Sequence, residues 1–207
     1  MKTKISIFLI LIFALSTGCA KIYYSADATS LALSHKLIAI APPSVSIAPS
    51  KKIDGQALIE QQKTESINFQ KEMYSWMLKR KMQGRISVEI QDVETTVAKL
   101  RKAGYYDGTP LSPAEICQVI GVDGLITSNY SLSKPMSEGA AIAVGLLVGV
   151  WGSTNSATVA LSIHDSKSQK MIWNFNHKLS GGTFSSPAQI VDGLMRQASR
   201  KMPYVTK

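Results

Sequence analysis

The chain has 207 residues, of which 45% are hydrophobic and 18% are charged, so it is too apolar for a disordered protein and long enough for one domain with extra segments. Its formal charge is +9. Two cysteines exclude a disulfide framework and a cysteine-based zinc site, and three histidines leave little room for a histidine-rich one. We therefore expect neither a bound metal nor a cofactor.

The amino terminus has the parts of an export signal. Lys2 and Lys4 give a short basic region, and Ile5–Leu15 is an apolar run of 11 residues interrupted only by Ser6. At about 1.5 Å per residue, such a run is too short to cross a hydrocarbon core of about 30 Å. Small residues then lead directly to Cys19.

This arrangement resembles a bacterial lipobox. The resemblance implies cleavage between Gly18 and Cys19, diacylglycerol transfer to the Cys19 sulfur and stable anchoring by several acyl chains. An ordinary signal peptide with a chance cysteine is the alternative. Ala20, rather than Asp, follows the cysteine, and by analogy with enteric sorting rules this indicates the outer membrane, facing the periplasm. We predict a signal peptide over 1–18 and a lipidated tether over 19–35.

The first part of the mature chain predicts a strand, a loop and a long helix. Residues 36–41 form a short apolar run stopped by two prolines, which favours a buried strand, and 44–55 predicts a loop around Pro49. Residues 56–83 lack Gly and Pro and are rich in helix-forming residues. The apolar face expected for this helix consists of Ile59, Ile67, Met73, Tyr74, Met77 and Leu78.

Alternating polar and apolar residues over 86–90 predict a strand with one buried face. Asp92 is the expected cap of a helix over 93–103. The residues expected to point inward from this helix are Val93, Val97 and Leu100.

A capping box of Ser112 and Glu115, with proline between them, predicts the start of another helix that ends at Gly121. Cys117 lies inside this helix, and we interpret it as a buried small hydrophobic residue, because no sequence feature supplies a nearby base. Residues 122–133 predict the next strand.

The last third predicts a hairpin and a closing helix. Alternation over 157–164 and 171–179, separated by a turn at 165–168, predicts two antiparallel strands. The second strand is expected to point Met171, Trp173, Phe175, His177 and Leu179 inward. Ser186 caps a helix whose expected buried residues are Ile190, Val191, Leu194, Ala198 and Met202.

This order of elements predicts an α/β fold with a mixed sheet of about five strands and helices packed on it. Crossover connections dominate the first part, and an antiparallel hairpin dominates the second. We predict a single domain over 36–204, interrupted by an apolar, glycine-rich insert at 135–155.

Three pieces of the chain resemble envelope lipoproteins with the fold of the TolB amino-terminal domain. They are the short helix and strand over 114–126, the hairpin with its Asp165-centred turn followed by Trp173, and the closing helix with Pro203-Tyr204. This group includes CsgG-like curli-secretion lipoproteins and LpoB-type activators of penicillin-binding proteins. The resemblance implies the fold. No functional residues carry over, because the shared positions look like core and turn.

Within the insert, Gly139–Gly152 is a run of 14 residues without charge that ends beside Trp151. In a helix, Ala141, Gly145 and Gly149 would share one face and allow close backbone contact. In a strand, the larger residues would share one face instead. Four interpretations stay open: a loop packed on its own domain, contact between copies in a homo-oligomer, insertion into lipid beside the anchor, and a pore-forming segment as in the curli-secretion relatives.

No motif of a known catalytic class is present in the sequence. It has no phosphate-binding loop, no zinc-protease motif and no EF-hand loop. His164 and Asp165 are adjacent, but neighbours on a strand point to opposite faces. We therefore expect no enzymatic activity.

The basic charge suits anionic lipid head groups or an anionic cell-wall polymer, or else belongs to a solvated surface. A nucleic-acid partner does not fit an exported protein. The sequence thus predicts a membrane-anchored periplasmic lipoprotein that acts as a non-enzymatic assembly or interaction module, with an envelope protein as partner. The alternatives are a subunit of an oligomeric curli-type secretion complex and an LpoB-like activator of a peptidoglycan synthase.

Overall fold

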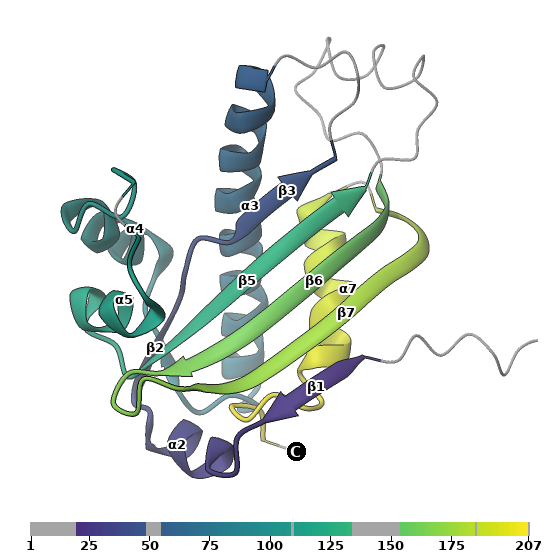
Figure 1. Ribbon diagram of the computed structural model, residues 1–207. Helices are drawn as coiled ribbons and strands as arrows, with labels where there is room; N and C mark the ends of the chain where they lie inside the picture. The colour runs from purple at the N-terminus through teal and green to yellow at the C-terminus, as the bar shows by residue number, and fades with distance from the viewer. Residues whose placement is uncertain (1–19, 49–54, 109, 134–153, 185, 207) are drawn as a thin grey trace, which may run out of the picture.

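The computed structural model describes residues 20–48, 55–108, 110–133, 154–184 and 186–206 (Figure 1). The signal peptide, Cys19 and the core of the insert therefore lie outside the described residues.

A seven-stranded mixed sheet is the central layer of the fold. Its order is β1-β7-β6-β5-β2-β4, and β3 also pairs with β5. The pairs among β2, β3, β4 and β5 are parallel, whereas β5, β6, β7 and β1 pair antiparallel. This confirms the predicted α/β class with a mixed sheet. The strands are β1 Lys21–Tyr24, β2 Leu37–Ile40, β3 Ser44–Ile47, β4 Glu89–Ile90, β5 Gly124–Ser133, β6 Thr154–Asp165 and β7 Met171–Phe184.

Helices cover both faces of the sheet, but unequally. The long α3 and α7 pack on one face, whereas α4 and α5 cover only the part of the other face near β2 (Figure 1). Alternate residues of β2 divide between these layers, because Ile38 and Ile40 join the larger core and Ala39 and Ala41 join the smaller one. The described helices are α2 Ala28–Ser34, α3 Gly55–Met82, α4 Val93–Lys102, α5 Pro113–Ile120 and α7 Pro187–Ala198.

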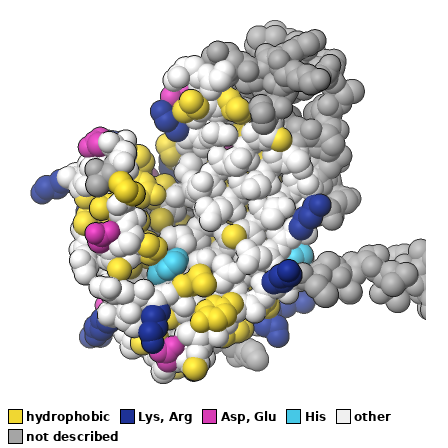
Figure 2. Space-filling model, in the orientation of Figure 1, with side chains coloured by type: hydrophobic (Ala, Val, Ile, Leu, Met, Phe, Trp, Pro, Cys, Tyr) yellow, Lys and Arg dark blue, Asp and Glu magenta, His cyan; other side chains and the backbone are white. Residues whose placement is uncertain are grey.

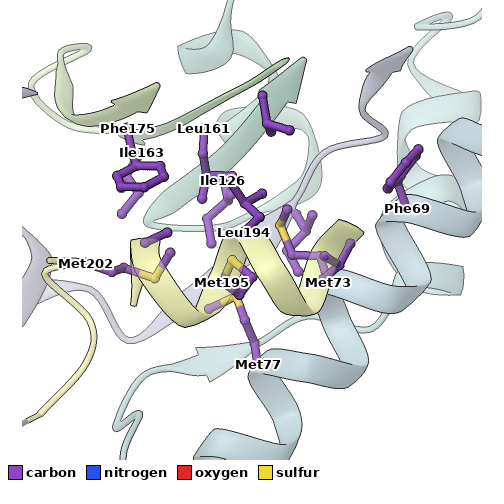
Figure 3. Packing of buried hydrophobic residues seen from close by; sticks show 14 of the residues in the cluster. Phe69, Met73, Met77, Ile126, Leu161, Ile163, Phe175, Leu194, Met195 and Met202 are labelled. Carbon is purple, nitrogen blue, oxygen red and sulfur yellow. The ribbon is translucent and has the colours of Figure 1, made fainter. Parts of the chain in front are cut away.

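The larger core lies between the sheet and the pair α3 and α7. Leu194 and Met195 of α7 meet Met73 and Met77 of α3 beneath the strand residues, of which Ile126 is one (Figure 3). Burying each such side chain contributes about 1.5–3 kcal/mol. The predicted antiparallel hairpin is confirmed: Ile163 pairs with Trp173, and Leu161 pairs with Phe175.

The predicted helix caps are confirmed. The Asp92 carboxylate accepts the Thr95 N–H at 2.7 Å, and Ser112 and Glu115 form a reciprocal capping box. Gly121 ends α5 with φ of +70°, a conformation that favours glycine. Ser186 likewise caps α7.

The segment expected to be a tether is folded instead. Residues 20–34 contain β1, which pairs with β7, and α2, whose Ala28 and Ala32 are buried. A four-residue edge strand is held by backbone pairing, so its side chains carry almost no hydrophobic period. The loop expected over 44–55 likewise contains β3, whose Val45 and Ile47 are buried.

The buried face of α3 also differs from the expected one. Met73 and Met77 are buried as predicted, whereas Ile59, Ile67 and Leu78 are exposed. The buried positions begin at Glu65 and include Phe69 and Gln70, whose amide donates to the Ile40 carbonyl at 2.8 Å. A helix of 28 residues is about 42 Å long, so its first turns extend past these core contacts. Val97 and Met171, also expected inward, are partly exposed.

Candidate functional site

An apolar groove of about 800 Å³ lies between the amino-terminal half of α3 and α4. It falls within the size range of binding clefts, which is about 300–1,000 Å³. Figure 2 shows a hollow beside the lobe that carries α4, with hydrophobic side chains gathered along it. The apolar residues that line the groove include Pro42, Val45, Ile59, Ile67, Val97 and Tyr106.

Two helical stripes form the walls. On α3, Ile59, Lys63, Ile67 and Lys71 recur at every fourth position and therefore follow one another along the helix surface. On α4, Val93, Val97 and Arg101 have the same spacing and line the opposite wall. The groove is therefore apolar along its length, with basic residues at regular intervals.

The floor of the groove fixes the position of α3. Pro42 and Pro43 follow β2 and end its ladder, because proline has no N–H to donate. The free Pro43 carbonyl accepts a hydrogen bond from the Ser66 hydroxyl at 2.6 Å. This bond ties the middle of α3 to the segment that follows β2.

The apolar side chains of the groove are far from fully buried. Ile59 is 46% exposed and Ile67 is 48% exposed. Full burial of such a side chain contributes about 1.5–3 kcal/mol, so each leaves a substantial part of that free energy unused in the described structure. Contiguous exposed apolar surface with a polar rim is typical of an interaction site.

The rim of the groove carries an excess of positive charge. Lys63 is compensated by Glu60, with 2.9 Å between Nζ and Oε1. Among the described residues, neither Lys71 nor Arg101 has an ion-pair partner, and Glu94 is the acid of the lining. A ligand with negative charge beside its apolar groups would therefore complement the groove.

Tyr106 adds a hydrogen-bond donor to this rim. Its pKa is raised, first by burial of the ring and then by the neighbouring Tyr105, while Arg101 acts in the opposite direction. The Tyr106 hydroxyl is therefore protonated at neutral pH. Its ring packs edge-on against Tyr105 with 5.2 Å between centroids, which holds it at the mouth of the groove.

A second polar arrangement, formed by His35, Asp165 and Tyr204, is buried. Asp165 Oδ1 lies 2.7 Å from His35 Nε2, and the Tyr204 hydroxyl lies 2.7 Å from His35 Nδ1. With a proton on Nε2, the His35 ring donates to Asp165, while its Nδ1 lies within hydrogen-bond distance of the Tyr204 hydroxyl. All three side chains are less than one-tenth exposed, so they join distant segments of the chain and do not meet a solute.

Electrostatics support a structural role for this cluster. Burial opposes ionisation of Asp165, but hydrogen bonds from Ser168 and from His35 outweigh it and hold the Asp165 pKa below its usual value. Burial raises the pKa of Tyr204, which keeps its hydroxyl protonated. Burial also raises the pKa of Cys117 to about 11, with the Asp165 charge acting in the same direction. Cys117 is therefore a protonated thiol in the smaller core, as predicted.

The residues singled out for lipidation and self-association lie outside the described residues: Gly18, Cys19, Ala141, Gly145, Gly149 and Trp151. The prediction that His164 and Asp165 point to opposite faces of the strand is confirmed. His164 Nε2 lies 3.1 Å from Thr127 Oγ1, whereas the Asp165 carboxylate is hydrogen-bonded to His35. In the part of the chain that the structure describes, no cluster of potential metal ligands occurs. No helix in that same part is long and apolar enough to span a bilayer.

Sequence reasoning missed both arrangements. Ile59 and Ile67 were assigned to the core, although their alternation with Lys63 and Lys71 is the signal that marks a surface stripe. His35 fell in the expected tether and Tyr204 at a helix end, so nothing in the sequence brought them to Asp165.

No family model matches this chain, and no curated protein matches its sequence. Among solved structures, lipoprotein GNA1162 from Neisseria meningitidis is similar at 13% identity and a TM-score of 0.45, covering 80% of this chain and 99% of that one. The LpoB C-terminal domain from Salmonella enterica is similar at 11% identity and a TM-score of 0.36, and the match covers 70% of this chain and 83% of that one. The PelC dodecamer from Paraburkholderia phytofirmans is similar at 10% identity and a TM-score of 0.40, and the match covers 92% of this chain and 99% of that one. Similarities this low carry no functional conclusion.

Proposed function

We propose that this chain is a non-enzymatic envelope lipoprotein, anchored through Cys19, whose α/β domain binds a partner protein in the groove between α3 and α4. The observation that carries the proposal is the half-exposed apolar stripe of Ile59 and Ile67 facing α4 across an open groove. The lipobox-like sequence before Cys19 supports the anchor, and Ala20 supports the outer membrane, facing the periplasm.

The chemistry of the groove defines the partner. Its lining is mostly apolar, and Lys71 and Arg101 bring uncompensated positive charge to the rim. The complementary ligand is a segment of another envelope protein that presents aliphatic or aromatic side chains next to Asp or Glu. Apolar contact would supply most of the affinity, while charge on the rim would favour acidic segments over basic ones.

The protonation and burial of the reactive groups support binding rather than catalysis. Cys117 is a fully buried thiol with a raised pKa, which disfavours the thiolate that a nucleophile needs. His35 and Asp165 are likewise enclosed and satisfy one another. A substrate could reach none of these groups without opening the core.

The test is photocrosslinking in the native envelope, with a photoreactive amino acid at Ile67. Val119 is the matched control, because it is an apolar residue of α5 with 42% exposure and lies outside the groove. We expect a discrete adduct from position 67 and none from position 119. Arg101→Glu should reduce the yield of the adduct. An added amphipathic peptide of Leu and Glu should compete for the groove, whereas the same peptide with Lys in place of Glu should compete less well.

Two results would contradict this function. Equal crosslinking from both positions would show non-specific contact, and an adduct of two copies of this chain would show self-association in place of a partner. The anchor is tested separately with a fatty-acid analogue, which should label the wild type and not Cys19→Ala. A wild type that takes up no label and stays in the soluble periplasm would overturn the lipoprotein assignment.

A further inference from the structure

The folded domain begins almost at the anchor. Lys21 is already the first residue of β1, and its Cα pairs with that of Asn176 on β7. Ala20 alone separates Cys19 from this strand. Two residues of extended chain span about 7 Å. The segment predicted as a tether therefore provides almost no distance between an acylated Cys19 and the sheet.

This distance is comparable with the thickness of the lipid head-group layer. A bilayer of about 40–45 Å with a hydrocarbon core of about 30 Å leaves about 5–8 Å of head groups on each side. A folded domain of this size has a radius of gyration of about 15 Å. A link of about 7 Å cannot hold such a body away from the surface, so the edge of the sheet that carries β1 must meet the head groups.

The side chains along this edge suit that position. Strand β1 exposes two aromatic residues, Tyr23 at 49% and Tyr24 at 44%, on opposite sides of the sheet. Tyrosine favours the interface between lipid and water, because its ring is apolar and its hydroxyl is polar. The Tyr24 hydroxyl donates to the Lys201 carbonyl and so places this edge beside the carboxyl-terminal end of α7.

Basic residues flank the two tyrosines. On the open face of the sheet, Lys21 lies opposite Asn176, and Lys178 follows on the same side of β7. On the helical side, Arg200 and Lys201 are exposed at the end of α7. Figure 2 shows Lys and Arg side chains along this edge and hydrophobic ones gathered at the adjoining end of the molecule.

The acids near this edge are paired with bases outside it: Asp27, which follows β1, has its Oδ2 3.6 Å from Lys170 Nζ. Residues 166–207 contain seven bases and a single acid, Asp192. Asp192 Oδ2 is itself paired with Arg196 Nε at 2.7 Å. Each Lys or Arg near an anionic membrane surface increases partition about fivefold. The charge of the edge therefore complements phosphate-bearing, acidic head groups.

We propose that the β1 edge, formed by Lys21, Tyr23, Tyr24, Lys178, Arg200 and Lys201, is a lipid-binding surface. It lies on anionic phospholipid head groups of the same bilayer that holds the Cys19 acyl chains, and the inference rests on the proposed anchoring at Cys19. The first turns of α3 lie at the opposite end of the molecule from β1 (Figure 1). Contact through the β1 edge would therefore turn the groove away from the membrane, toward a periplasmic partner.

The test uses the full acylated protein in liposomes that contain a lipid-borne collisional quencher. A fluorophore is attached through Tyr23→Cys, and the matched control is Ile59→Cys, which has similar exposure at 46% and lies in the first turns of α3. Labelling is selective, because the Cys19 sulfur would be a thioether and Cys117 is fully buried. Lys178→Cys marks the same edge from β7 and serves if Tyr23→Cys does not fold.

We expect the lipid quencher to reduce fluorescence at position 23 or 178, and iodide in the aqueous phase to reduce it at position 59. Quenching at the edge should increase when phosphatidylglycerol replaces part of the phosphatidylcholine. If iodide still quenched the fluorophore at position 23 or 178 in an acylated, membrane-bound protein, the proposal that the β1 edge binds lipid would be wrong, while the proposed anchor would stand. Protein that carries no acyl chains and does not bind the liposomes would overturn both.

Discussion

Gly124 gives a sharp test of the buried His35–Tyr204 contact. A Cβ at this position would lie 2.5 Å from His35 Nδ1 and 2.6 Å from the Tyr204 hydroxyl, which are the two atoms of that hydrogen bond. Gly124→Ala must therefore separate them. Overpacking costs about 1–3 kcal/mol, and loss of the bond adds about 1 kcal/mol, so we expect destabilisation of about 2–4 kcal/mol.

Gly193→Ala is the matched control in the same chain. Its Cβ would meet Leu179 Cδ2 at 3.7 Å, an ordinary contact, inside α7. Alanine in a helix interior is favoured over glycine by about 0.5–1 kcal/mol. Since a domain of this size shifts by about 2–4 °C per kcal/mol, we expect Tm to fall by about 5–15 °C for Gly124→Ala and to rise by a few degrees for Gly193→Ala.

The cause can be separated from a general defect of β5 by a double variant. Tyr204→Phe removes the hydroxyl that the new methyl group meets, so the effects of Gly124→Ala and Tyr204→Phe should be smaller together than their sum. The measurement is the Tm from thermal unfolding, followed by circular dichroism, of the wild type, the two single variants and the double variant. A wild-type Tm for Gly124→Ala, or strictly additive losses in the double variant, would refute the argument.

Three further predictions concern the core and its titration. Trp173→Ala should lower the free energy of unfolding by about 3–5 kcal/mol, because the ring is fully buried. Asn174→Ala should lower it by about 1 kcal/mol, because it loses only the hydrogen bonds to Leu161 and Ser162. Equal Tm values for the two variants would refute the assignment of Trp173 to the buried face of β7. The folded pKa of Asp165 lies below its ordinary value of 3.8, so its contribution is present at neutral pH and lost as pH falls through the folded pKa. Tm should therefore drop in acid, and less steeply in Asp165→Asn than in wild type. Cys117 should react with maleimide at pH 8 only after denaturation, and rapid labelling of native protein would contradict its burial.

Most of the fold could be predicted from the sequence, because its elements are long or carry explicit end signals. The hairpin alternates over many residues, and the helix starts at Asp92, Ser112 and Ser186 are marked by side chains that accept backbone N–H groups. Such local signals depend on a few neighbouring residues. Elements with such signals can therefore be predicted without knowing the tertiary contacts of the rest of the chain.

The errors arose where tertiary contacts decide the structure. Strands β1 and β3 have four residues each, too few for a period to emerge, and backbone pairing with β7 and β5 defines them. The candidate site was missed for a related reason. An isoleucine predicts burial by its chemistry alone, but whether Ile59 and Ile67 meet the core depends on where α3 crosses the sheet.

Ile67 and Met73 lie on the same helix and allow the open groove to be tested through stability alone. Met73 is fully buried, so Met73→Ala should cost about 2–5 kcal/mol. Ile67 is half exposed, so Ile67→Ala forfeits only part of its transfer free energy and should cost about 1 kcal/mol or less. The measurement is the Tm of each variant of the full chain, without any partner. If Ile67→Ala were as destabilising as Met73→Ala, another part of the chain would have to cover Ile67, and the groove would be closed to a partner. A small loss, together with a discrete adduct from the photoreactive amino acid at position 67, would mean that Ile67 serves binding rather than folding.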